Sequence, residues 1–116
     1  MQKQKERNQP MSVRIKQVVP VTGDFLLDQA TRDYIGKYLA PDTVVDVEVI
    51  PEGQYSIESE YDEAVNAPQV VKLCKKAAAE GYDGIYVDCF GDPGVRAARE
   101  CVCIPVFGGF EPAMLM

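Results

Sequence analysis

The stretch GIYVDCFGDPG, residues 84–94, carries the strongest fold signal in the chain. Its β-branched and aromatic start predicts a buried strand, and the Gly and Pro residues after Cys89 predict a turn. Asp92 and Pro93 then suit the N-cap and the first position of a helix that runs through Arg99. A strand that leads through a short turn into a helix is the repeating unit of α/β proteins, so the stretch predicts that fold class.

The same alternation extends over the rest of the chain. We expect strands at residues 13–21, 43–50, 84–88 and 104–107, because these runs are apolar and β-branched. Helices are expected over residues 27–38, from Asn66 and Pro68 to a C-terminal Gly81, after Asp92, and from Glu111 onward. This pattern predicts a three-layer α/β sandwich with a flavodoxin-like, four-stranded parallel sheet of order 2-1-3-4 and helices on both faces.

The domain prediction separates a leader from a single folded unit. Residues 1–11 are polar and charged, and we expect them to be a disordered leader. Residues 12–116 are expected to form one α/β domain. The last predicted helix has barely begun when the chain ends at Met116, so it is too short to cover the fourth strand. We therefore expect the domain to be a truncated, N-terminal part of a longer protein.

Composition narrows the possible partners. The chain has 116 residues, of which 47% are hydrophobic, enough for one core. A net charge of −6 argues against nucleic acid or an anionic membrane as partner. No apolar run approaches the ~20 residues of a membrane span, and there is no signal-peptide pattern. We expect a cytoplasmic protein with reduced cysteines.

Cys89 is the candidate reactive residue. It follows a predicted parallel strand, and ligands of open α/β sheets bind at the carboxyl ends of the strands. A helix N-terminus nearby would favour the thiolate, whereas Asp88 and Asp92 would favour the neutral thiol. From the residues alone, a reactive thiolate and a small buried core residue remain equally good interpretations.

The spacing of the other cysteines argues against a metal site, and the absence of phosphate-binding motifs argues against a nucleotide site. Cys74 falls on the apolar face of a helix and is predicted to be core. Cys101 and Cys103 occur without histidine or a CxxC pair, so we expect helix-end packing for Cys101, a loop or strand start at Cys103, and no metal. No G-x-G-x-x-G or Walker pattern follows a strand. Residues 51–61 form either a functional loop or a solvated acidic connection.

Three stretches together resemble the N-terminal domain of the aspartate/glutamate/hydantoin racemase superfamily. They are VPVT at residues 19–22, YSIESEYDEA at 55–64 with Pro68 after it, and VDCFGDPG at 87–94 followed by AARE and IPV. The combination of SIES-YDE with CFGDPG is specific. The resemblance covers the chain from about Val13 to its end.

The resemblance implies cofactor-free racemisation or epimerisation by two cysteines. One thiolate removes the Cα proton, and the other thiol returns a proton to the opposite face. Cys89 would be the first of these. The substrate would be a small amino acid, hydantoin or carboxylic acid. The substrate-binding positions implied by the match are Pro20, Val21, Thr22, Ser56, Ile57, Phe90 and Gly91.

Two departures from the family pattern affect this interpretation. The turn VPVT lacks the amide side chains of the Asn-Pro-Asn-Thr-like turn found in many relatives, which leaves the substrate open. The family's second cysteine belongs to a second domain, and Cys101 and Cys103 do not match it. The alternatives are therefore a superfamily decarboxylase or cis–trans isomerase, or a non-catalytic binding module. Such a module could self-associate as a homo-oligomer with two Cys89 thiols face to face.

Overall fold

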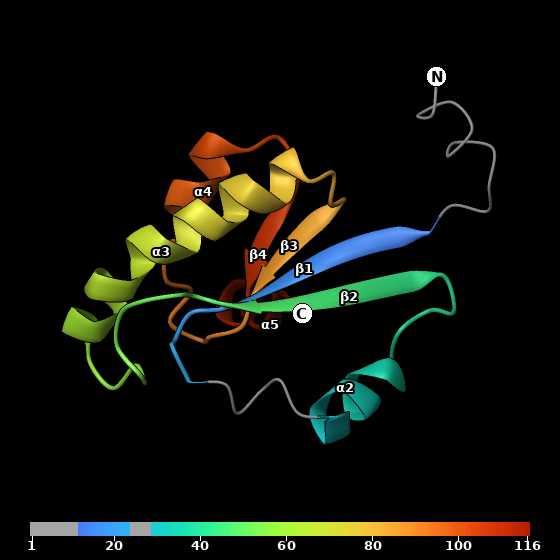
Figure 1. Cartoon of the computed structure of the whole chain (residues 1–116), viewed down its shortest axis with the longest axis horizontal. Helices are drawn as coiled ribbons and strands as arrows, with labels where there is room; N and C mark the ends of the chain where they lie inside the picture. Colours follow the sequence, from blue (N-terminus) through green and yellow to red (C-terminus); the bar gives the residue numbers. More distant parts are fainter. Residues whose placement is uncertain (1–11, 24–28) are drawn as a thin grey trace.

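A computed structural model describes residues 12–23 and 29–116 (Figure 1). The predicted leader and the first residues of the helix expected at 27–38 lie outside these ranges. The described elements, in chain order, are β1 (Val13–Val19), α2 (Gln29–Gly36), β2 (Thr43–Val49), α3 (Glu60–Ala79), β3 (Gly84–Val87), α4 (Val95–Cys101), β4 (Val106–Gly108) and α5 (Phe110–Leu115).

The four strands form one parallel sheet in the order β2-β1-β3-β4, which confirms the predicted α/β topology. β1 is central, and its residue Ile15 is in register with Val45 on one side and Gly84 on the other. All strands run in the same direction, so their carboxyl ends meet at one edge of the sheet. The turns that follow β1 and β3 therefore lie close together.

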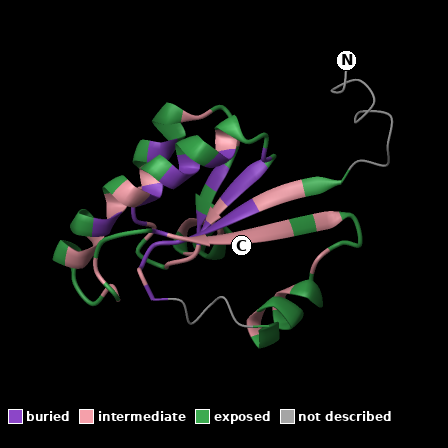
Figure 2. Ribbon diagram, viewed as in Figure 1, coloured by how far each residue is buried: buried purple, intermediate pink, exposed green. Residues whose placement is uncertain are grey.

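The core lies between the sheet and the two helices α3 and α4, which cover one face (Figures 1 and 2). α2 lies on the opposite side of the sheet, and none of its eight residues is buried. Cys74 is fully buried in the core, as predicted. The other core residues include Val18, Ile85 and Val87 from the strands and Val70, Leu73, Ala77, Val95 and Ala98 from the helices.

The helices α3 and α4 begin at residues that differ from those predicted from the sequence. α3 begins at Glu60, because the Ser59 side chain accepts a hydrogen bond from the Asp62 N–H and caps the helix there. Pro68 lies inside α3 rather than at its start. α4 begins at Val95 after Gly94 rather than at an Asp92 cap. The predicted glycine at the end of α3 is confirmed, since Gly81 follows Glu80 with a φ of 86°.

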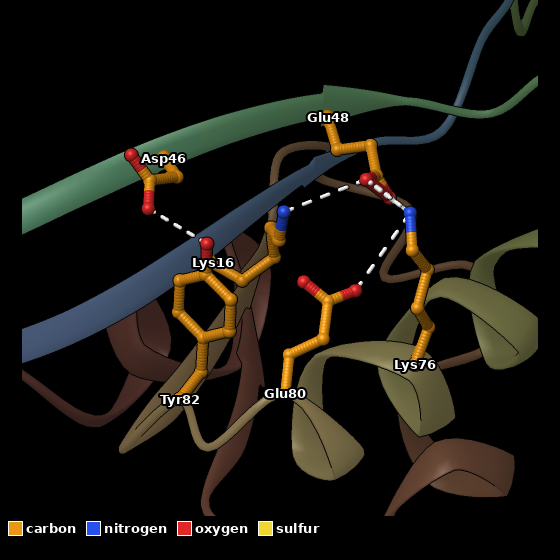
Figure 3. Close-up of polar contacts among 6 residues, drawn as sticks. All are labelled: Lys16, Asp46, Glu48, Lys76, Glu80 and Tyr82. Carbon is orange, nitrogen blue, oxygen red and sulfur yellow. Dashed lines mark hydrogen bonds and ion pairs between the residues drawn. The ribbon is translucent and has the colours of Figure 1, made fainter.

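A polar network ties the edge strand β2 to α3 (Figure 3). Lys16 of β1 is only 6% exposed, and its Nζ lies 3.5 Å from Glu48 Oε1. Lys76 of α3 contacts the same oxygen at 2.9 Å. Lys16 also lies over the ring of Tyr82, whose hydroxyl donates a hydrogen bond to Asp46. Glu48 of β2 thus joins a buried cation on β1 to an exposed one on α3.

The pKa of Glu48 should make this network sensitive to pH. Burial raises the pKa, but the hydrogen bond from Lys76 and the charges of Lys16 and Lys76 outweigh it and lower the pKa below 4.5. The folded state therefore favours the ionised form. Its contribution to stability is present above pH 4.5 and is lost as the pH falls through the lower, folded value.

We expect Glu48→Gln to lower the free energy of unfolding by about 1 kcal/mol at neutral pH. The difference from the unsubstituted chain should shrink as the pH falls below 4.5, as measured by urea denaturation at several pH values. Glu80→Gln is the matched control, because Glu80 is more exposed and contacts only Lys76 among the described ion pairs. Equal losses in the two variants would contradict the role given to Glu48.

Candidate active site

A pocket of about 240 Å³ lies where the turns after β1 and β3 meet the loop that precedes α3. It brings together five of the residues that the sequence nominated: Pro20, Val21, Ser56, Ile57 and Cys89. Val19 and Asp88 complete the described lining. Cys89 is half-buried in this pocket rather than enclosed in the core. The interpretation of Cys89 as one more core residue is therefore wrong.

Three nominated residues lie next to the pocket but not in its lining. The Thr22 N–H donates a hydrogen bond to the Gln54 carbonyl at 3.2 Å, so Thr22 joins two of the segments that form the pocket. Phe90 is 70% exposed. Gly91 faces a neighbouring pocket between α3 and the start of α4, where a side chain at this position would collide with Glu63.

Asn66 of α3 holds the pocket-forming segments together. Its side chain is fully buried, and its Nδ2 donates to the carbonyls of Pro20 at 2.8 Å and of Gln54 at 3.2 Å. Its Oδ1 accepts from the Gln54 N–H at 2.8 Å. Gly53 approaches so closely that a Cβ there would collide with this amide. The sequence predicts Asn66 at the start of a helix, whereas it lies inside α3 and is buried. A polar residue on the apolar face of this helix is the sequence feature that indicates its role.

The turn that carries Cys89 is fixed by Asp92. The Asp92 N–H donates to the Cys89 carbonyl at 3.1 Å and closes the turn. The Asp92 carboxylate accepts from the N–H groups of Phe110 and Glu111, at 3.1 and 3.2 Å, which belong to the first turn of α5. Asp92 adopts a φ of 49°, which non-glycine residues rarely do. The residue expected to cap α4 therefore serves α5 instead.

The electrostatic environment favours the neutral form of the Cys89 thiol. Burial raises the pKa of Cys89, and a hydrogen bond from the Gly91 backbone partly offsets this. The charges of Glu63, Asp88 and Asp92 raise the pKa further, so the net result lies above the ordinary value. α4 begins only at Val95, six residues after Cys89, and burial together with the three carboxylates sets the direction of the shift in the pKa of Cys89.

A second, larger cavity of about 450 Å³ lies between α2 and the opposite face of the sheet. Asp88 lines both this cavity and the Cys89 pocket. The remaining lining is mostly apolar and consists of Ile15, Gln17, Thr31, Ile35, Leu39, Val45, Tyr86 and Phe107. Burial together with the Asp88 charge raises the pKa of Tyr86 to about 12, so its hydroxyl stays protonated.

The described residues contain neither a cluster of metal ligands nor a membrane-spanning helix. No group of three or more His, Cys, Asp or Glu side chains there is arranged to hold a metal ion. Cys101 and Cys103 are both exposed, so the expected packing of Cys101 at the end of its helix is wrong. Among the described helices, none is long and apolar enough to cross a membrane.

Comparisons of sequence and of structure with known proteins both find racemases. Residues 26–116 match the sequence model of the Asp/Glu/hydantoin racemase family. The hydantoin racemase of Pseudomonas sp. (strain NS671) is 44% identical over 64 residues, which cover 55% of this chain and 26% of that protein. The hydantoin racemase of Paenarthrobacter aurescens is 31% identical over 91 residues, covering 78% and 39%.

Among solved structures, the chain is similar to the allantoin racemase from Klebsiella pneumoniae. It has a TM-score of 0.80 and 36% sequence identity, and it covers 90% of this chain and 42% of that one. The chain thus spans between about a quarter and two-fifths of the length of these relatives.

Asn66→Ala should destabilise the chain by about 2–3 kcal/mol, because three backbone groups lose their buried hydrogen-bond partner. Chemical denaturation measures this loss. Lys72→Ala, an exposed substitution on the same helix, is the control and should change stability by less than about 0.5 kcal/mol. A cost for Asn66→Ala as small as that of the control would show that the amide does not hold the segments together.

Glu63→Gln should lower the pKa of Cys89, since Glu63 is the first of the three carboxylates whose charge raises it. The rate of alkylation of Cys89 by iodoacetamide at neutral pH should rise roughly two- to fivefold, with its midpoint at lower pH. Glu58→Gln, in the exposed loop before α3, should leave the rate unchanged. A Glu63→Gln profile that coincides with the unsubstituted one would contradict this electrostatic account.

Proposed function

The chain belongs to the Asp/Glu/hydantoin racemase family, and from that premise we propose that it is the first α/β half of a cofactor-independent racemase. Cys89 is proposed as one of the two proton-transferring groups. The observation that carries this proposal is the pocket in which Cys89 meets the turn after β1 and the Ser56 loop. Three segments that are distant in sequence form a small cavity around one thiol.

The proposed reaction is proton transfer at a carbon acid. A thiolate takes the proton from the stereogenic carbon, and the electron pair of the broken C–H bond delocalises onto the adjacent carbonyl oxygen. A thiol on the opposite face then returns a proton to the same carbon. Backbone N–H groups of the surrounding turns would stabilise the enolate-like oxygen, and each such donor can contribute about 3–4 kcal/mol.

The environment of Cys89 bears on its role in this cycle. Because its pKa is raised, Cys89 at neutral pH is chiefly a thiol and suits the acid, which returns the proton. In the reverse direction the same group must act as the base. We propose that Cys89 rests as the acid in one direction and removes the proton as the base in the other, the role that the resemblance implies for it. Of the four cysteines, only Cys89 lines the described pocket, so we propose that the opposite thiol comes from a second half.

We propose a hydantoin-type substrate rather than a dicarboxylic amino acid. Hydantoin racemases are among the curated relatives, and an allantoin racemase is the structural neighbour. The turn of Pro20, Val21 and Thr22 also lacks amide side chains that could bind a carboxylate. A cyclic substrate of this kind carries its acidic carbon next to a carbonyl group, which suits a thiolate base.

A second candidate is self-association without catalysis. Large apolar side chains are exposed around the site edge and at the C-terminal helix, and these could meet a second copy. They are Phe90, Phe110, Met114 and Leu115. This reading predicts a dimer in solution and no proton exchange, so the experiment on catalysis also separates the two candidates.

With one thiol in the pocket, the chain should exchange the C5 proton of one enantiomer of a 5-substituted hydantoin in D₂O with retention of configuration. NMR measures the exchange, and chiral chromatography measures the configuration. Cys89→Ser should return the rate to that of buffer, because serine is a far weaker acid–base group than cysteine at neutral pH. Cys103→Ser is the control and should leave the rate unchanged. Equal exchange by the Cys89→Ser variant, or no exchange above buffer by the unsubstituted chain, would contradict the proposed catalysis.

A further inference from the structure

Asp88 occupies a position in the Cys89 pocket that sequence reasoning did not assign. It follows β3 directly, two residues after Tyr86, so both side chains lie on the sheet face opposite α3 and α4. Asp88 lines the Cys89 pocket and also the larger cavity against α2, and its charge acts on Cys89. Asp88 is the charged residue among those described that line the Cys89 pocket.

Two neutral donors hold the Asp88 carboxylate in place. Gln17 Nε2 donates to Oδ2 at 2.9 Å, and the Tyr86 hydroxyl donates to Oδ1 at 3.2 Å. Gln17 is only 4% exposed, so the orientation of its amide is fixed by packing. Neither donor carries a positive charge, so among the described residues the negative charge of Asp88 is oriented but not neutralised. A carboxylate can accept about four hydrogen bonds, so Asp88 can accept from a ligand as well as from these two donors.

The charges around this pocket discriminate between kinds of ligand. Glu63 and Asp92 add their negative charges near Cys89, and none of the described lining residues is cationic. A ligand with a free carboxylate would bring a further negative charge into a partly desolvated space, which is unfavourable. A neutral ring with N–H groups would instead find a well-oriented acceptor, and hydrogen bonds to charged acceptors are the stronger kind.

We propose that Asp88 is the specificity-determining residue of the Cys89 pocket. It accepts a hydrogen bond from an N–H group of a neutral cyclic ureide and disfavours ligands that carry a free carboxylate. Gln17 and Tyr86 are positioning residues that aim the carboxylate. This inference rests on the proposed function and goes beyond it, since it names the residue and the interaction that select the substrate.

Protection of Cys89 from alkylation tests the proposal on the chain as it is. The two ligands are 5-methylhydantoin and N-carbamoylalanine, which share a carbon skeleton but differ by an opened ring and a carboxylate. Uncharged iodoacetamide is the alkylating reagent, and peptide mass spectrometry reads Cys89 separately from Cys101 and Cys103. These two exposed cysteines serve as internal controls. The hydantoin should protect Cys89 at concentrations about tenfold lower than the carbamoyl compound does.

Three variants separate the charge of Asp88 from its orientation. Asp88→Asn should bring the two ligands to within about twofold of each other, because the charge is lost. Gln17→Met keeps the charge but removes a donor, so protection by the hydantoin should weaken while the carbamoyl compound stays excluded. Asp42→Asn, at the opposite end of the sheet before β2, should keep the tenfold preference. For each variant, the rate of Cys89 alkylation with ligand is divided by the rate without ligand. This ratio cancels any direct effect of the substitution on the reactivity of the thiol.

The outcomes distinguish this inference from the proposed function. Equal protection by both ligands, or an unchanged preference in Asp88→Asn, would overturn the role of Asp88 while leaving Cys89 as a ligand-binding thiol. Preference for the carbamoyl compound would overturn it as well. No protection of Cys89 by either ligand would overturn both the role of Asp88 and the proposed function.

Discussion

The site depends on one buried amide. Asn66 projects from α3 and satisfies backbone groups of the turn after β1 and of the loop before α3 at the same time. A buried polar group without partners is costly, so these segments and the helix are mutually constrained. Because α3 is itself anchored to the sheet by its apolar face, the positions of Pro20 and of the Ser56 loop follow from the packing of the core.

Burial and nearby negative charges raise the pKa of the Cys89 thiol. Cys89 lies in a turn that Asp92 joins to α5, and the charges of Glu63, Asp88 and Asp92 act on its thiol. These carboxylates and partial burial keep the proton on the sulfur. In the proposed reaction one group is protonated while the other is deprotonated, and the raised pKa of Cys89 supports the proposal that it returns the proton.

Local sequence patterns were sufficient for the sheet, but from the residues alone the burial of Cys89 stayed open. Alternating apolar strands and helices predicted the strand order, and the glycine at the end of α3 was recognisable from its neighbours. Long-range side-chain contacts were not predictable in this way. Asp92 has the local features of a cap for α4, but its partners are N–H groups 18 and 19 positions further along the chain.

The start of α3 shows a different limit. Ser59 and Asp62 form a local capping pattern, yet Pro68 offered a competing start signal, and only the tertiary structure decides between them. The roles of Asn66 and Asp88 depend on partners 46 and 71 positions away, respectively. The neighbouring residues do not indicate such pairings. A polar residue on an otherwise apolar helix face indicates only that a buried partner is needed.

The most direct test of the account is a crystal structure of this chain with a 5-substituted hydantoin bound. We predict that the C5 atom lies within about 3.5 Å of Cys89 Sγ, in the space between the Pro20 turn and the Ser56 loop. A ligand found only in the larger cavity against α2, with Cys89 out of reach of the carbon acid, would contradict the central claim.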